Sequence, residues 1–376
     1  KTSSFTLRSR ITKSRRLPPN RYKNMSIRAA RHDAAGEKAI AVWLLVCAAL
    51  VFAMVVLGGA TRLTHSGLSM VDWRPLTGFL PPLSDAAWET VFTDYQSYPE
   101  YQKVNADMSL SEFKGIFWFE YSHRLLGRLI GIAFLVPFLY FAWRKWISRP
   151  LLPKLVLMFV LGGLQGVLGW YMVKSGLVDR PDVSHLRLTA HLGAAFLIFG
   201  FILWVALGLM EAGIRTGAVA RANPWLRPAA LVLLAATPVV ALSGGLVAGL
   251  DAGFHYNTFP LMGDSFVPEG MGTLQPWWRD MFNNRTTVQF GHRVLAETLF
   301  VLAVVYYFRV RQLAVPVRVR LALNGLAAAI AVQVALGIST LVLVVPVVLA
   351  VAHQGGALVV FGCALWVTRE LSPPSA

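Results

Sequence analysis

At 376 residues the chain is long enough for two or three soluble domains, but 56% of its residues are hydrophobic and only 14% are charged, against about 25% charged in a typical soluble domain. The net charge of +16 does not indicate nucleic-acid binding. Eleven of the 35 Lys and Arg residues lie in the first 38 positions, ahead of the first apolar span, where a basic segment primarily indicates membrane topology. The sequence therefore predicts an all-α integral membrane protein with no nucleic-acid partner.

The chain begins with a basic tail over residues 1–38. Its first 24 residues are rich in Arg, Lys, Ser and Thr and contain no acid, which is typical of an organelle transit peptide. They do not begin with Met, whereas Met25 opens a plausible mature start, so a translated upstream stretch is an equal alternative. No secretory signal peptide is needed, since the first apolar span can insert the chain.

Eight apolar runs follow the tail, and each is close to the length of about 20 residues that a transmembrane helix needs. Both cysteines, Cys47 and Cys363, lie within such runs, so neither a disulfide framework nor a cysteine metal site is expected. The runs predict helices at 40–60, 117–142, 155–173, 188–210, 229–250, 288–308, 321–341 and 346–367.

The connections between these spans alternate in charge. Segments 143–154, 211–228 and 309–320 carry 11 Lys and Arg and one acid, whereas the other connections carry 9 Lys and Arg and 13 acids. The positive-inside rule then places both termini and the basic loops on the cytoplasmic side, or on the matrix side in an organelle. The long loops 61–116 and 251–288 are predicted to lie outside.

The sequence contains an internal repeat. Gly58-Gly59 at the end of the first span matches Gly244-Gly245 in the fifth, and three further matches follow in chain order. Four ordered matches predict two tandem four-helix halves, related by a pseudo-twofold axis along the membrane normal because four spans preserve orientation. The three further matches are 120–126 with 289–295, 165–169 with 333–337, and 190–193 with 352–355. The predicted segments are the tail 1–38, the halves 39–211 and 229–368, the cytoplasmic linker 212–228 and the tail 369–376.

The repeat retains two histidines in each half, His123 and His191 in the first and His292 and His353 in the second. All four are predicted at similar depth in the outer half of the bilayer, where polar side chains are costly and need a partner. Two imidazoles from facing helices are the axial ligands that a haem iron accepts, and an interhelical hydrogen-bond network is the alternative. Nearby small residues would let a flat macrocycle approach: Gly127, Gly193, Gly355 and Gly356. The remaining histidines have no repeat partner and are expected to be solvated: His32, His65, His185 and His255.

Charged residues near these histidines suggest two further roles. Arg62, Arg124 and Arg293 are candidate contacts for haem propionates, because a guanidinium is a fixed cationic fork; anchoring at the membrane edge is the alternative. Glu120 lies three residues before His123 on the same helical face, and its repeat counterpart is Gln289.

The Glu/Gln difference separates the two halves chemically. A carboxylate beside an iron site can move protons or orient a reacting water, whereas an amide cannot take up a proton. The first half is therefore predicted to carry acid–base chemistry and the second to suit electron transfer. A plain ion pair between Glu120 and Arg124 is the alternative interpretation.

The run GGATRLT at 58–64, continuing through SGLSM at 66–70 to DWRP at 72–75, with EYSHR at 120–124, closely resembles the haem A synthase family over roughly residues 40–368. The resemblance implies eight helices in two four-helix halves and the conversion of haem O to haem A, by oxidation of a porphyrin methyl to a formyl group through successive hydroxylation. It also implies one role for each matched residue: substrate haem at His123 and His191, haem b at His292 and His353, and an essential carboxylate at Glu120.

The resemblance has one departure. Some bacterial members carry a cysteine pair in the first outer loop, and loop 61–116 has none, so the chain is similar to the branch shared by mitochondria and related bacteria, and a cysteine-based mechanism is excluded. Trp73 and Trp88 of this loop could cover the site, although anchoring at the lipid interface is favoured.

The resemblance also implies partners and a location. They are haem O with its farnesyl tail in the lipid, haem O synthase, terminal oxidase assembly factors and an electron acceptor outside the chain. A homo-oligomer stays open. The Ala- and Val-rich spans favour a bacterial inner membrane over a mitochondrial one.

Two rival functions are weaker. A non-catalytic dihaem b-type electron-transfer protein would explain the four histidines, but not the Glu120/Gln289 difference or the motif over 61–75. A duplicated transporter would bind no pigment, and its sequence should show broken helices, for which only Pro137, Pro238 and Pro346 are candidates.

Overall fold

The computed structural model describes residues 19–72, 78–178, 181–210 and 222–372, and for 19–34 the backbone alone. Within these ranges eight helices are long and apolar enough to cross a membrane, and they coincide with the eight predicted spans. The chain is therefore an all-α, multi-pass membrane protein. The helices are α1 (Pro19–Leu63, apolar from Ala35), α4 (Leu110–Trp143), α5 (Leu152–Lys174), α6 (His185–Met210), α8 (Leu226–Gly249), α10 (Arg285–Arg311), α11 (Val317–Val342) and α12 (Val347–Glu370).

Shorter helices occupy the outer loops and have no counterpart among the predicted elements. The first outer loop contains α2 (Asp85–Gln96) and α3 (Pro99–Lys103), and the second contains the 3-10 turn η1 (Ala252–Phe254) and α9 (Trp277–Asn283). Two predicted boundaries also differ. The tail 1–38 is already helical from Pro19, and α8 begins inside the predicted linker 212–228. Residues 1–18, 211–221 and 373–376 lie outside the described part of the chain.

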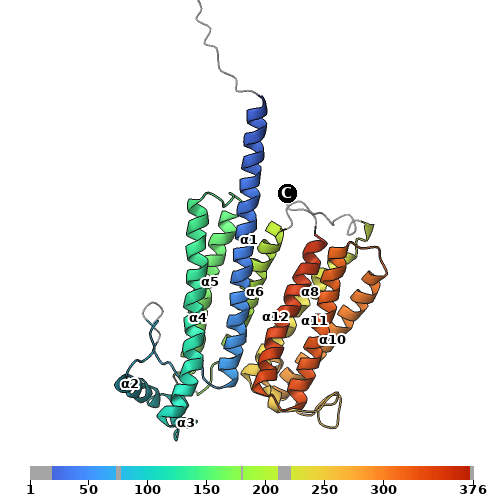
Figure 1. The fold of residues 1–376 in the computed structure, drawn as a ribbon. Coiled ribbons are helices and arrows are strands. Elements are labelled where there is room, and N and C mark those ends of the chain that lie inside the picture. The colour runs from blue at the N-terminus through green and yellow to red at the C-terminus, as the bar shows by residue number, and fades with distance from the viewer. Residues whose placement is uncertain (1–18, 73–77, 179–180, 211–221, 373–376) are drawn as a thin grey trace, which may run out of the picture.

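The same helix pairings occur in both halves of the bundle. In the first half α1 packs on α4 and α6, and α5 packs on α4 and α6. In the second half α8 packs on α10 and α12, and α11 packs on α10 and α12. The repeat in sequence is thus repeated in packing, while the pseudo-twofold axis stays a prediction. The halves meet through α1, α6, α8 and α12, which lie between the pair α4/α5 and the pair α10/α11 (Figure 1).

The two ends of the bundle differ in what they carry. The beginning of α1 and the end of α12 lie at one end, and α2 and α3 lie at the other, beside the start of α4 (Figure 1). The spans are only partly covered by protein: 39% of the most apolar window of α1 is buried, and 6% of that of α5. Apolar side chains left uncovered in this way are suited to lipid contact.

The start of α4 is fixed by a capping box. The hydroxyl of Ser109 accepts a hydrogen bond from the backbone nitrogen of Glu112 at 3.3 Å, and the carboxylate of Glu112 accepts one from the backbone nitrogen of Ser109 at 2.8 Å. The helix therefore begins ahead of the predicted position 117, and Glu120 and His123 lie inside its outer turns rather than at its end.

Candidate functional site

One large cavity runs through the outer part of the bundle. Its volume is about 1580 Å³, more than the roughly 300–1,000 Å³ of a pocket for one drug-sized ligand. All four repeated histidines line it, together with Glu120. The residues that the repeat singles out are therefore brought together around one space, which has room for more than one ligand.

Each of the four histidine rings lies against a glycine of a neighbouring helix. A Cβ atom built on that glycine would come within 2.8–3.0 Å of Cε1 of the ring, a separation at which something must shift. The glycines therefore give each imidazole room that no other residue would leave. The four pairs are Gly58 with His123, Gly169 with His191, Gly244 with His292, and Gly337 with His353.

The backbone around the histidines is also fixed in the same way in each half. The side-chain amide of Gln165 donates to the carbonyl oxygen of His191, and that of Gln333 donates to the carbonyl oxygen of His353, both at 2.9 Å. The hydroxyl of Ser243 lies 2.8 Å from Nδ1 of His292. These contacts hold the histidine-bearing turns in place without occupying Nε2 of any ring.

The second-half histidines fit a shared iron. The ring centroids of His292 and His353 lie 6.5 Å apart with the rings at 88°. Metal–imidazole bonds are about 2 Å long, which puts the ring centroids of two axial ligands roughly 6–7 Å apart. Among the described residues no three His, Cys, Asp or Glu side chains gather into a closed metal site. A pair of imidazoles is a donor set that a haem iron accepts.

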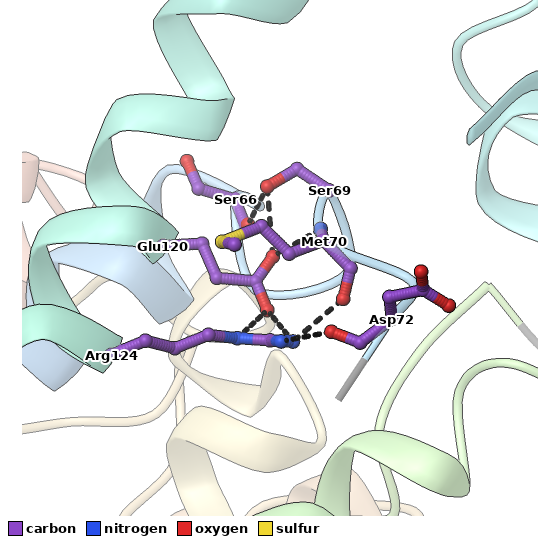
Figure 2. A network of polar contacts seen from close by, with 6 residues as sticks. All are labelled: Ser66, Ser69, Met70, Asp72, Glu120 and Arg124. Atoms are coloured by element: carbon purple, nitrogen blue, oxygen red, sulfur yellow. Dashed lines mark hydrogen bonds and ion pairs between the residues drawn. The ribbon is translucent and has the colours of Figure 1, made fainter. Parts of the chain in front are cut away.

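The buried carboxylate of Glu120 is surrounded by hydrogen-bond donors (Figure 2). Its Oε2 accepts from the hydroxyl of Ser69 at 2.8 Å and from the backbone nitrogen of Met70 at 2.7 Å. Its Oε1 accepts twice from the guanidinium of Arg124, so the ion pair considered from the sequence does form. Four donors, two of them on the guanidinium of Arg124, therefore hold both carboxylate oxygens in place.

The same guanidinium extends the network into the first outer loop. Arg124 donates to the carbonyl oxygens of Met70 at 2.6 Å and Asp72 at 2.7 Å. The loop is thereby tied to the helical turn that precedes His123 (Figure 2). The last part of the loop motif, Trp73 to Pro75, lies outside the described residues.

The other two candidate propionate arginines are engaged by protein groups as well. Arg62 binds the carboxylate of Asp251 at 3.0 Å and the carbonyl oxygen of Ala248 at 3.1 Å, which joins the two halves. Arg293 donates to the carbonyl oxygens of Tyr256, Thr258 and Leu261 in the second outer loop. A propionate at any of the three arginines would have to share the guanidinium with these acceptors.

The Glu/Gln difference between the halves is visible in the contacts. Gln289 is as buried as Glu120, and its amide donates to the carbonyl oxygen of Tyr256 at 2.8 Å. Both side chains therefore fasten the outer loop of their own half. Of this pair only Glu120 is an acid, because the side chain of Gln289 is a neutral amide.

Several expectations from the sequence are corrected by the structure. Gly193, Gly355 and Gly356 do not face an open space, since a Cβ on each would meet a side chain. His185 is half-buried and not solvated. Its Cβ packs against Gly249 of α8, in the space that a side chain at position 249 would fill. Trp88 is 8% exposed and packs against Phe117 and Trp118, so it belongs to the aromatic core of the first outer loop and not to a lipid anchor.

Substituting Gly337 by Ala tests the close approach of glycine and imidazole. The added methyl would lie 2.8 Å from Cε1 of His353, so the ring must move, and we expect the purified variant to hold less haem per chain in an absorption measurement. Gly325→Ala in the same helix is the matched control, because its nearest neighbours lie at 3.9 Å. Equal haem content in the two variants would contradict the role assigned to Gly337.

Comparisons with known proteins identify a matching family and several relatives. Residues 41–365 match the family model described as Cytochrome oxidase assembly protein. A relative from Nitrosospira multiformis is 54% identical over 338 residues, covering 89% of this chain and 94% of the relative. Relatives from Nitrosomonas eutropha (89% and 94% covered) and Rhodospirillum centenum (92% and 91% covered) are each 50% identical. All three relatives are named Heme A synthase.

Proposed function

The chain belongs to the haem A synthase family, and from this membership we propose that it oxidises one methyl group of haem O to a formyl group by successive hydroxylation, giving haem A. It is thus an enzyme of haem A biosynthesis. The observation that supports this reaction best is the single cavity lined by two histidine pairs and by Glu120, whose counterpart in the second half is the amide Gln289.

In this proposal the two histidine pairs bind different haems. His123 and His191 flank the substrate haem O, and His292 and His353 hold a resident haem b, for which the 6.5 Å ring separation is suitable. Haem b bound there supplies a one-electron redox centre. The assignment of substrate to the first half rests on Glu120, which lies one helical turn from His123.

Glu120 is the essential carboxylate of the proposed site. Its four hydrogen bonds fix both carboxylate oxygens and hold the loop 66–72 against α4 at the edge of the cavity. A fixed anion at this position can orient a water molecule or a developing positive charge without moving. Arg124 pairs with Glu120 and donates to two carbonyl oxygens of the same loop. The loop, held in this way, excludes bulk water from this edge of the cavity.

The proposal extends to the setting of the enzyme. The halves 39–211 and 229–368 are the two haem-binding domains, and electrons leave to an acceptor outside the chain. Haem O synthase and terminal oxidase assembly factors are the expected partners. The basic loops place the termini on the cytoplasmic side of a bacterial inner membrane.

The haem content of the purified protein tests the proposed reaction. We expect a pyridine haemochrome spectrum and chromatography of the extracted haems to show haem b together with haem O or haem A, and added haem O to be converted to haem A. Two haem b molecules per chain would instead favour the dihaem electron-transfer protein. A colourless, folded chain would contradict both functions.

A further inference from the structure

A second buried carboxyl group, Glu100, lines the same cavity as Glu120. It lies in α3 of the first outer loop and is 5% exposed. The hydroxyl of Tyr95, at the end of α2, donates to its Oε2 at 3.0 Å and accepts a hydrogen bond from the side-chain amide of Asn105 at 2.8 Å. Tyr95 is itself 0% exposed, so a hydrogen-bonded acid is built into the core of the loop that covers the site.

The surroundings of the two carboxyl groups differ in charge. Glu120 has four donors, including a guanidinium, whereas in the described part of the chain Glu100 has a single donor to its carboxyl group, the neutral hydroxyl of Tyr95. The other ionisable groups that face Glu100 are two acids, Glu120 of α4 and Asp182 before α6. Glu100 therefore lies among neutral and acidic groups, which favours its neutral form, whereas Glu120 is held by a guanidinium.

The acidity of Glu100 follows from these contacts. Burial, the largest effect, raises the pKa of Glu100, the hydrogen bond from Tyr95 lowers it, and the charges of Glu120 and Asp182 raise it. Together they raise the pKa to about 8. Burial also raises the pKa of the Tyr95 hydroxyl, which therefore stays protonated.

We propose that Glu100 exchanges protons between the cavity and the outer aqueous side, while Glu120 holds the loop. The inference rests on the proposed oxidation, which releases protons inside an apolar cavity. In each exchange a proton leaves a water or hydroxyl group in the cavity and binds a carboxylate oxygen of Glu100; it then leaves to the outer side, and no electrons are transferred. The route is short, since α3 lies in the outer loop and the exposed His65 lines the same cavity.

The Glu100→Gln variant tests this exchange, with Glu89→Gln as the matched control on the exposed face of α2. Because the deprotonated acid accepts protons, the wild-type rate of haem A formation should rise as the pH increases through about 8. E100Q should lose this rise and be about 100-fold slower at the top of the profile, at the low end of what a positioned acid–base group contributes. E89Q should keep the wild-type profile, and an E100Q profile of the same shape would overturn the proposal.

An infrared titration without added substrate gives a readout independent of turnover. The carbonyl band of a protonated carboxylic acid should titrate with a midpoint near pH 8 in the wild-type protein, disappear in E100Q and persist in E89Q. Tyr95→Phe removes the hydrogen bond that lowers the pKa, so it should move this midpoint and the rate profile to higher pH. An unchanged midpoint in Y95F, or a band that survives in E100Q, would overturn the proposal.

The two readouts also separate this inference from the proposed function. If the wild-type protein makes no haem A, the proposed function is wrong. The infrared titration would then show whether Glu100 still takes up protons. A wild-type protein that makes haem A with a pH profile unaffected by E100Q would retain the function and remove the role of Glu100.

Discussion

Replacing Glu120 by Gln is expected to lower the rate of haem A formation by at least about 100-fold while leaving bound haem in the second half. Both oxygens of the carboxylate accept hydrogen bonds, one from Ser69 and Met70 and the other from Arg124. An amide has one oxygen and one NH2 group, so in either orientation its NH2 meets donors. The variant therefore loses the loop contact or the arginine contact, and it also loses the negative charge at the cavity.

The glutamine variant is preferable to alanine for this test. Removing one partner of a buried ion pair costs about 3–5 kcal/mol, and the side chain of Arg124 is only 15% exposed, so E120A would also disturb the fold. Turnover with added haem O and haem content are measured on the same preparations. Gln289→Ala is the matched control in the second half and should retain most of the wild-type rate. Wild-type turnover in E120Q would refute the role of this carboxylate.

The eight spans could be predicted because each is a nearly uninterrupted apolar run. In lipid every backbone polar group must be hydrogen-bonded within the protein, and a helix achieves this within a single run. The predicted ends of these spans were less accurate. The start of α4 lies in a polar stretch, where the capping box of Ser109 and Glu112 decides it. That signature is readable from the sequence, whereas α2 and α3 are stabilised by an aromatic core assembled only when the loop packs on α4.

The site was predictable where the repeat duplicated it. The four histidines and the pairing of Glu120 with Arg124 follow from spacing along helices. The bond from Ser69 to Glu120 joins residues 51 positions apart, and no local pattern reveals it. Glu100 lies in a loop, so only its burial against Tyr95 identifies it. The glycines beside the imidazoles belong to the repeat, but which of the many glycines face a ring depends on helix rotation.

His353→Ala is expected to give a purified protein that has lost the haem of the second half, while His191→Ala retains that haem and loses the ability to bind and convert haem O. Each substitution removes one imidazole of a proposed haem-binding pair. The fold should survive both, because Gln333 and Gln165 donate to the backbone carbonyl oxygens of these residues, which an alanine keeps. Haem per chain from absorption, together with haem O turnover, distinguishes the two variants.

The unequal outcome is the informative part of this pair. Gln165, Gln333 and the glycines opposite each ring make the two positions nearly equivalent in packing, so a difference between the variants must come from what the two sites bind. The exposed His255 in the second outer loop is the control, and its alanine variant should match the wild type in both measurements. Equal loss of haem b from H191A and H353A would mean that the halves do not form separate sites, and the division into a substrate site and a haem b site would then be wrong.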